Sequence, residues 1–270
     1  MGTAAKIIGV EDSAISKISG VTLTGVSKVA GQDISSFPNT YSMNFDGAND
    51  YVATGFTGAV TSCSFWFKPD AEINTSSGYG CFIGFEDGGQ YSGIYFGAVV
   101  SAISNELITI FSNGSILNKS YYSQVGGTIN TDWHHLVISH TGTQYNIYLD
   151  NVNVFTANYN GDVGLITATR CDIGVRILSG VVNGAFPGLI DEVAVWDAEL
   201  DSDAVTVIWN NGTPTDLSVN SGNYDNSGDL QAWYRLGDNG SFKSTQWLIP
   251  NNANKDKVSN YSMDFDGSND

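Results

Sequence analysis

The sequence predicts an all-β protein of antiparallel strands, and three observations support this fold class. First, the 270 residues include 31 Gly, 13 Tyr and 13 Phe but only 14% charged residues, a balance that favours short strands and tight turns over helices. Second, residues 132–154 contain two apolar runs around the polar break Thr141–Gln144, which is the pattern of a β-hairpin. Third, residues 186–200 form an almost continuously apolar strand that ends on polar residues, and this strand can cover the apolar face of the hairpin.

An eleven-residue repeat occupies residues 1–36. Its recurring positions are Lys6, Ile8, Gly9, Lys17, Ile18, Gly20, Lys28, Val29 and Gly31. A segment this short cannot bury a core by itself, so we expect it to fold against another chain or surface and to act as an anchor. Glycine in every unit argues against a continuous coiled coil. A repeat of eleven residues is also a period of supercoiled helices, so a helix stays an alternative. A flexible leader is the competing interpretation.

Residues 37–216 carry most of the expected strands. These are 41–45, 63–68, 80–85, 93–99, 107–112, the hairpin within 132–154, 171–175 and 189–196. Turns rich in Gly, Asn and Ser separate them, as antiparallel connections require. After the last strand, Asp201 offers an N-cap for a short helix over 204–210, which Gly212 ends. We expect this helix to plug one end of the fold.

Five motifs in these strands carry a family resemblance. They are FDG-x-x-D-Y-V at 45–52, SFWFKP at 64–69, WHHL at 133–136, IYLDN at 147–151 and G-x-IDEV-x-VW-x-x-x-L at 188–200. In this order they resemble the laminin-G-like, concanavalin-A-like jelly roll. The resemblance implies an antiparallel β-sandwich over 37–216. It leaves the activity open, because the same sandwich carries lectins, adhesion modules and hydrolases.

The C-terminal residues 217–270 resemble the start of a second jelly roll. Residues 261–270 repeat residues 41–50 with two changes, and residues 230–238 are similar to the strand that precedes this motif in the family. No such strand precedes the first copy. The first sandwich therefore borrows residues 230–238, from its own chain or a neighbour, or the chain is a fragment, and we prefer the fragment interpretation.

Charge and cysteine content exclude several functions. The formal net charge of −17 repels phosphate backbones and anionic lipid, so we expect neither nucleic acid nor membrane insertion, while cations and neutral glycans stay suitable partners. No apolar run is long enough to span a bilayer, and the first residues lack the apolar core of a secretory signal. Cys63, Cys81 and Cys171 match no metal or redox spacing, so we expect buried thiols, with a disulfide between Cys63 and Cys81 as the alternative.

The sequence indicates no catalytic site. Glycoside cleavage needs a pair of carboxylates across the bond, and the nearest pattern, Glu199-Leu-Asp201-Ser-Asp203, falls where acids serve a helix start. Adjacent histidines on a strand point to opposite faces, so we expect His134, His135 and His140 to be structural. The chain also lacks the common nucleophile, zinc-protease and phosphate-loop motifs.

Two sets of residues are candidates for binding. Calcium, which several branches of the resembled family bind, would be held by Asp46, Asn49, Asp50 and Asp191, although Asp-Gly and Asn-Asp are also turn formers. Sugar rings would stack on tyrosines near loops, namely Tyr79, Tyr91, Tyr121, Tyr122 and Tyr159. Because Asp191 and Glu192 are neighbours in a strand, one of them should point inward or towards the rim. A buried acid needs a partner, either a hydrogen bond or an arginine such as Arg170 or Arg176.

The repeats in 1–36 also resemble segments at the start of bacteriophage virion proteins. We therefore expect a non-enzymatic, homo-oligomeric virion protein, a fibre or decoration attached to other virion subunits of the capsid or tail through these residues. It would be made in the host cytoplasm and display its jelly roll on the particle surface to bind host carbohydrate. A purely architectural, capsid-cementing protein and a polysaccharide-degrading enzyme are the alternatives.

Overall fold

The computed structural model divides the chain into two compact units, residues 1–39 and residues 40–270. It describes residues 17–18, 21–22, 28–29, 32–33, 39–73, 80–86, 93–99, 106–113, 116–123, 129–158, 166–178, 181–238, 241–243 and 246–253. Within these ranges, no helix is long and apolar enough to cross a membrane.

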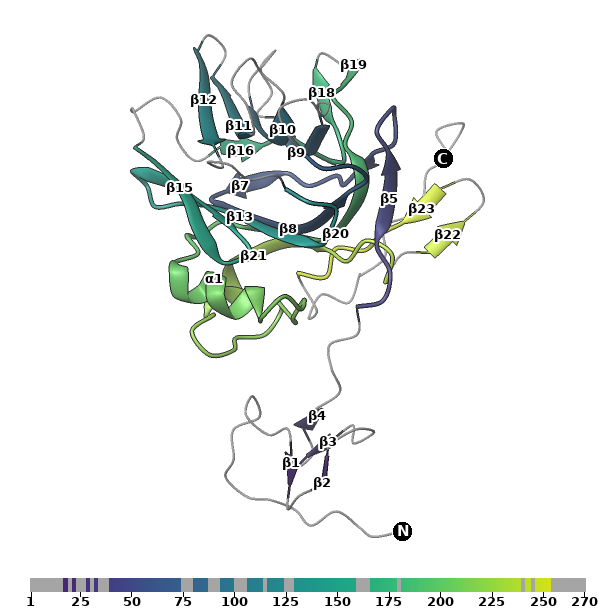
Figure 1. The fold of residues 1–270 in the computed structure, drawn as a ribbon, viewed down its shortest axis with the longest axis vertical. Helices are drawn as coiled ribbons and strands as arrows, with labels where there is room; N and C mark the ends of the chain where they lie inside the picture. The colour runs from purple at the N-terminus through teal and green to yellow at the C-terminus, as the bar shows by residue number, and fades with distance from the viewer. Residues whose placement is uncertain are drawn as a thin grey trace. The chain divides into compact units, whose positions relative to one another are not determined.

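The described part of the first unit consists of two short antiparallel pairs (Figure 1). They are β1 (Lys17–Ile18) with β2 (Val21–Thr22), and β3 (Lys28–Val29) with β4 (Gln32–Asp33). The second pair follows the first at a distance of eleven residues, with two intervening residues in each pair. The sequence repeat is therefore also a structural repeat, and at these positions it is β-structure rather than the helix kept as an alternative.

The second unit is built on a seven-stranded antiparallel sheet. Its strands are β15 (Val152–Asn158), β14 (Gln144–Leu149), β13 (His134–His140), β8 (Ser62–Pro69), β20 (Pro187–Trp196) and β21 (Leu230–Tyr234) in spatial order, with β5 (Met43–Asp46) also paired to β20. The hairpin expected within 132–154 is thus present as β13 and β14, and β15 continues it as a meander.

A six-stranded sheet faces it across the core (Figure 1). In spatial order its strands are β12 (Ile116–Ser123), β11 (Glu106–Asn113), β10 (Gly93–Val99), β9 (Gly80–Glu86), β17 (Arg170–Ile173) and β6 (Val52–Ala53). Short pairs complete the unit: β7 (Gly58–Val60) with β16 (Ile166–Ala168), β18 (Arg176–Leu178) with β19 (Val181–Asn183), and β22 (Ser241–Lys243) with β23 (Gln246–Leu248). The fold is the antiparallel jelly-roll β-sandwich that the sequence predicts.

The core lies between the two sheets and is rich in phenylalanine. Phe65 and Phe67 of β8 reach Phe82 of β9, with ring centroids 5.3 Å and 4.5 Å apart, and Phe186 packs 4.6 Å from Phe82. All four side chains are at most 1% exposed. Large aromatic side chains contribute most of the burial free energy of a core of this kind.

The three cysteines are buried free thiols, as the sequence predicts. Burial raises the pKa of Cys171 to about 12 and raises the pKa of Cys63 as well, so neither thiol forms a thiolate at neutral pH. The disulfide alternative between Cys63 and Cys81 is wrong.

The outer face of the seven-stranded sheet, opposite the core, is covered by helix α1 (Ser202–Trp209) and the segment that follows it. The side chain of Asp201 caps the helix by accepting hydrogen bonds from the backbone N–H groups of Asp203 and Ala204. The helix ends at Asn210, which has the left-handed φ of 43°. The helix start was therefore predicted correctly, but the helix packs on a sheet face rather than plugging an end, because Trp209 stacks on Trp66 of β8 with centroids 5.3 Å apart.

Strand β21 belongs to the same sheet. Its residues pair with β20, Tyr234 opposite Val193 and Trp233 opposite Ala194, and Ala232 and Tyr234 enter the core. A 3-10 helix, η2 (Asn226–Asp229), leads into it. Of the two interpretations of residues 230–238, the chain thus shows borrowing within itself, and these residues are part of the sandwich rather than of a separate extension beginning at 217. The repeated motif at 261–270 lies outside the described residues.

Candidate functional site

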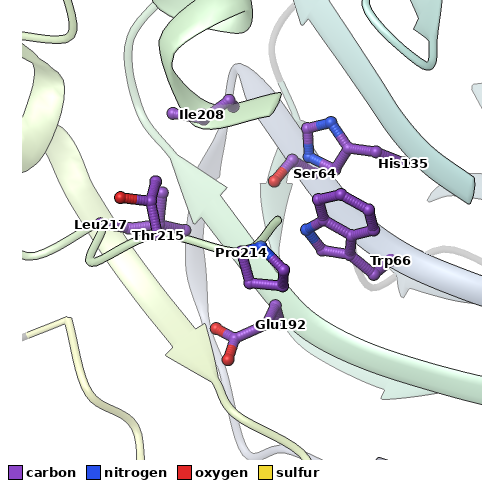
Figure 2. Close-up of a pocket in the computed structure, with 8 residues that line it drawn as sticks. All are labelled: Ser64, Trp66, His135, Glu192, Ile208, Pro214, Thr215 and Leu217. Carbon is purple, nitrogen blue, oxygen red and sulfur yellow. The ribbon is translucent and has the colours of Figure 1, made fainter. Parts of the chain in front are cut away.

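A pocket lies between the outer face of the seven-stranded sheet and the covering segment, and we call it the outer-face pocket (Figure 2). It is small, with a cavity volume of about 10 Å³, which is room for about one water molecule. It is lined by Ser64, Trp66, His135, Glu192, Ile208, Pro214, Thr215 and Leu217. The first four come from the sheet, Ile208 comes from α1, and the last three come from the segment after the helix. Pro214 and Thr215 are half-buried, so the pocket comes nearest to solvent at these two residues.

Alternation along the strands explains how polar side chains arrive at this face. Cys63, Phe65 and Phe67 of β8 point into the core, so the intervening Ser64 and Trp66 point to the outer face. Ser64 lies between Val137 of β13 and Ala194 of β20, which are its partners in the sheet register. The small Ala194 side chain leaves room next to the serine.

An aromatic stack forms one wall of the pocket. Trp66 lies 4.8 Å from the imidazole of His135 and 5.3 Å from the indole of Trp209, centroid to centroid. His135 is 2% exposed, and burial lowers its pKa to about 3. The imidazole is therefore neutral at physiological pH and offers one donor and one acceptor nitrogen.

One polar side chain of the pocket is deeply buried with an atom that has no hydrogen-bond partner. It is His135, whose Nδ1 atom has none in the described part of the chain. Figure 2 shows the imidazole edge of His135 directed towards Ser64. A buried polar group without a partner costs about 1–3 kcal/mol, so such groups call for a ligand or an ordered water.

Glu192 forms the opposite side of the pocket and sits in a β-bulge. The core residues of β20 are Ile190, Val193 and Val195, and the odd step from 190 to 193 requires one extra residue in the strand. The register against β8 shifts between Asp191 and Ala194, and Glu192 has the positive φ of 50°. Such a conformation is unusual for glutamate. It is typical of functional sites and of positions where the surrounding structure enforces the strained backbone.

The Glu192 carboxylate is held by two residues of the β21 region. It accepts a hydrogen bond of 2.6 Å from the Trp233 indole N–H and one of 3.0 Å from Nε of Arg235. Burial raises the pKa of Glu192 to about 7, although Arg235 and the two hydrogen bonds oppose this shift. The carboxyl group therefore changes its protonation near neutral pH.

Asp191 and Asp238 complete a cluster of three carboxylates with Glu192, and the carboxylate atoms of the three lie within 4.8 Å of one another. The cluster lies where the start of β5 and the end of β21 meet along β20. Asp238 accepts hydrogen bonds from the backbone N–H groups of Thr40, at 2.9 and 3.0 Å, and of Tyr41, at 3.3 Å. Asp238 thereby fixes the segment that leads into β5.

The prediction that an arginine such as Arg170 or Arg176 pairs with a buried acid of β20 is wrong for Glu192. Its partner is Arg235, which lies 43 residues further along the chain. Arg170 instead pairs with Asp172 in its own strand, with a separation of 2.6 Å between Nε and Oδ2. A contact between residues so far apart in sequence depends on β21 joining this sheet.

The structure does not bring the calcium candidates together. Asp46 is opposite Pro187 in the β5–β20 register, four residues along the strand from Asp191, which corresponds to about 13 Å. The carboxylate of Asp46 accepts hydrogen bonds from the N–H groups of Ala48 and Asn49, and Asp50 accepts one from the N–H of Asp46. These side chains close a turn, which is the alternative considered for them. The proposed calcium set of Asp46, Asn49, Asp50 and Asp191 therefore does not fit one ion.

The tyrosine candidates stay predictions. Tyr79, Tyr91 and Tyr159 lie outside the described residues, and Tyr121 and Tyr122 lie in β12, of which only the backbone is described. Of the anchor positions, Lys17 and Ile18 lie in β1 and Lys28 and Val29 lie in β3, while Lys6, Ile8, Gly9, Gly20 and Gly31 lie outside the described residues.

The three histidines have framework contacts. His134 bonds Asp150 through Nδ1 at 2.7 Å and Asn130 through Nε2 at 2.9 Å, and the backbone N–H of Gly142 donates to Nδ1 of His140. Ser64, His135 and Glu192 line one pocket, but they do not form a nucleophile triad. Ser64 and His135 share no hydrogen bond, and Glu192 bonds Trp233 and Arg235 rather than the imidazole.

Comparisons with known proteins agree with the sandwich architecture. The solved structures that resemble this chain include a candidate carbohydrate-binding protein of Bacteroides ovatus ATCC 8483, with a TM-score of 0.54 and 14% identity over 78% of this chain and 55% of that one. They also include the CBM40 of Ruminococcus gnavus IT-sialidase bound to α2,3-sialyllactose, with a TM-score of 0.48 and 8% identity over 62% of this chain and 97% of that one. A third is the LG4-5 domains of the mouse laminin α1 chain, with a TM-score of 0.45 and 15% identity over 61% of this chain and 43% of that one. This chain thus spans about half the length of the Bacteroides protein, and no curated protein matches it.

The fold and the sequence together define the class. The chain is an antiparallel jelly-roll sandwich with a covered outer face. The family described as the concanavalin A-like lectin/glucanases superfamily matches residues 46–206, which is more than half of the chain. The chain belongs to this superfamily.

Proposed function

We propose that this protein is a carbohydrate-binding module that performs no catalysis. The observation that carries the proposal is its membership of a superfamily of lectins and glucanases, combined with the way its buried carboxylates are used. Several similar structures come from proteins whose names refer to carbohydrate binding, which supports the lectin side of the superfamily.

The engagement of the acids favours binding over hydrolysis. A glycosidase needs two carboxylates that face the scissile bond and change their roles there. In the part of the chain that the structure describes, the group of three nearby acids is Asp191, Glu192 and Asp238, and the latter two hold Trp233, Arg235 and the backbone of Thr40. These acids stabilise the junction of β5, β20 and β21.

A glycan array with the full chain tests this proposal. We expect binding to a subset of uncharged glycans and no release of reducing sugar from those same glycans. The heat-unfolded protein is the control for adhesion through exposed apolar surface. Absence of binding across the array, or steady production of reducing ends, would contradict the proposal.

We further propose that residues 1–36 anchor the protein to an assembly, as a fibre or decoration on the surface of a bacteriophage particle. The observation that favours an anchor is the structural repeat, two β-pairs spaced by eleven residues, because short repeats gain stability by stacking on neighbours. The location on a virion rests on the resemblance of the repeats. A capsid-cementing role is the variant in which the sandwich itself contacts neighbouring subunits.

Deletion of residues 1–39 tests the anchor. The truncated chain should stay folded and should fail to associate with purified particles, whereas the full chain should sediment with them. Association that persists after the deletion would assign particle binding to the sandwich and favour cementing.

A further inference from the structure

We infer that residues 261–270 are a second strand for the place that β5 occupies on β20, and that they complete the sandwich of their own chain when β5 leaves it. We call these residues the C-terminal copy. Their sequence, although they lie outside the described residues, and the contacts of β5 carry this inference. It concerns the integrity of the sandwich and is independent of the proposed carbohydrate binding.

Strand β5 fills its place with one core side chain and a tight turn. Phe45 is 2% exposed and belongs to the core between the sheets. Gly47 has φ of 74°, and a Cβ atom there would lie 2.8 Å from Cβ of Pro187 in β20, so glycine is strongly favoured. The carboxylates of Asp46 and Asp50 close the turn by accepting hydrogen bonds from backbone N–H groups. The place on β20 therefore suits the pattern Phe-Asp-Gly followed three residues later by Asp.

The C-terminal copy supplies all of these groups at the same spacing. They are Phe265, Asp266, Gly267 and Asp270. The two differences between the segments are Asp264 in place of Asn44 and Ser268 in place of Ala48, and both Asn44 and Ala48 are exposed. A strand formed by the C-terminal copy would therefore bury the same side chain and close the same turn as β5.

The chain is long enough to bring the C-terminal copy to β20. Asn252 lies beside β21, where its backbone N–H donates to the carbonyl of Trp233 at 2.7 Å. Trp233 is opposite Ala194, and Met43 of β5 is opposite Ile190 on the same edge of β20. The two points are thus about 14 Å apart, one strand spacing across and four residues along the sheet. The chain from Asn252 to the counterpart of Met43 spans up to about 35 Å, which leaves length for it to reverse direction.

The C-terminal copy acts when β5 is withdrawn. In the intact sandwich β5 has the advantage, because only a short turn connects it to β6. Residues 1–39 lead directly into β5, so a pull on them acts on β5 before any other strand of the sandwich. Loss of β5 would leave backbone groups of residues 187–190 unpaired and the place of Phe45 in the core empty, and the C-terminal copy fills both.

A double-mutant cycle in the full chain tests this replacement. Phe45→Ala weakens β5, and Phe265→Ala weakens the C-terminal copy. Phe265→Ala alone should leave the midpoint of thermal unfolding unchanged, because β5 already fills the place. Phe45→Ala alone should lower the midpoint by a few degrees, and the double variant should lower it by about 5 °C more, because no intact strand is then left for β20.

Tyr261→Ala is the matched control, because its counterpart Tyr41 is 65% exposed. Combined with Phe45→Ala, it should cause no additional loss. An additive cycle, in which Phe265→Ala has the same effect with and without Phe45→Ala, would overturn the inference. So would a Phe45→Ala chain that unfolds as completely as the double variant.

Disulfide trapping locates the C-terminal copy directly. In the Phe45→Ala chain, Asp264→Cys is combined with Leu189→Cys, because Asn44 is opposite Leu189 in the register. This pair should crosslink within one chain at least tenfold faster than Asp264→Cys combined with Thr143→Cys on an exposed turn. The three native cysteines are buried, so they do not compete. Equal rates, or a crosslinked dimer in place of a crosslinked monomer, would refute the assignment of the C-terminal copy to its own sandwich.

Discussion

At the residue scale, Glu192 and His135 are two buried groups of one pocket. The pKa of Glu192 is raised and that of His135 is lowered, so the two groups change the stability of the fold with pH in opposite directions. Burial raises the pKa of Glu192 from 4.5 to about 7, so the folded state holds a proton that the unfolded chain releases. The stabilisation from this group is complete below pH 4.5 and is lost as the pH rises to 7. Burial lowers the pKa of His135 from 6.5 to about 3, so its stabilisation is complete above pH 6.5 and is lost as the pH falls.

The two contributions should therefore offset each other between pH 4.5 and 6.5. Glu192→Gln removes one of them, and the free energy of unfolding should then fall, relative to the wild type, as the pH drops through this window. His135→Phe should give the opposite slope. Each slope should approach 1.4 kcal/mol per pH unit at most, and urea unfolding at several pH values measures it. Parallel curves for both variants would show that neither group titrates in this window.

Gly174 illustrates a position where the backbone and the core both demand glycine. It has φ of 86°, and a Cβ atom there would lie 2.4 Å from Cδ1 of Phe45, a core residue. Gly174→Ala should therefore lower the free energy of unfolding by about 2–4 kcal/mol, the sum of left-handed strain and overpacking. Gly142 has a similar φ of 88° with nothing within 4 Å, so Gly142→Ala should cost only about 1 kcal/mol. Equal losses in thermal unfolding would mean that Phe45 moves aside.

At the scale of elements, β20 organises the sandwich. One of its edges pairs with β8 along most of its length, and its other edge is shared by β5, opposite residues 187–190, and β21, opposite residues 193–196. The bulge at Glu192 lies where these two partners meet. The carboxylate cluster, Arg235 and Asp238 stabilise this junction, which connects the start of the sandwich to a strand nearly 200 residues later.

This arrangement makes a prediction about β21. A chain ending at residue 229 lacks Ala232, Trp233, Tyr234 and Leu236, which are all at most 3% exposed, and leaves Glu192 buried without Arg235. Such a chain should lose cooperative unfolding, because it exposes core surface and an unpaired charge. Calorimetry against a chain ending at residue 253 measures the loss. A cooperative transition within a few degrees of the longer chain would mean that β21 is dispensable to the sandwich.

The sequence predicted the elements that local patterns encode. Alternation and turn residues identified the hairpin, a nearly continuous apolar run identified β20, and Asp201 identified the helix start. Strand β12 was missed because Ile116–Ser123 does not alternate between apolar and polar residues. The bulge in β20 was not predicted either, although the odd spacing between the core residues Ile190 and Val193 indicates it in the sequence. The pocket could not be predicted, because Ser64, His135 and Thr215 meet only after α1 has covered the sheet.

At the scale of the whole molecule, the chain combines a small repeated unit with a much larger sandwich. The sandwich contains a continuous core and all three partner strands of β20, so residues 40–253 have what a domain needs to fold alone. The repeat segment is too short to bury a core by itself and should depend on association. Shallow or small glycan sites are weak individually, and several copies joined through the repeats would act together.

Residues 40–253 should consequently keep the thermal stability of the full chain and its affinity for a single sugar, while the avidity for a glycan-coated surface should fall at least tenfold. Once one copy in an assembly has bound the surface, the other copies bind at a high effective concentration because they are joined to it. A chain without the repeats is not joined to other copies and loses this advantage. Analytical ultracentrifugation gives the copy number, and surface plasmon resonance on a dense and on a sparse glycan surface separates avidity from affinity. The full chain should lose its advantage on the sparse surface. If both chains sediment as monomers and dissociate from the dense surface at the same rate, the repeats do not assemble this protein.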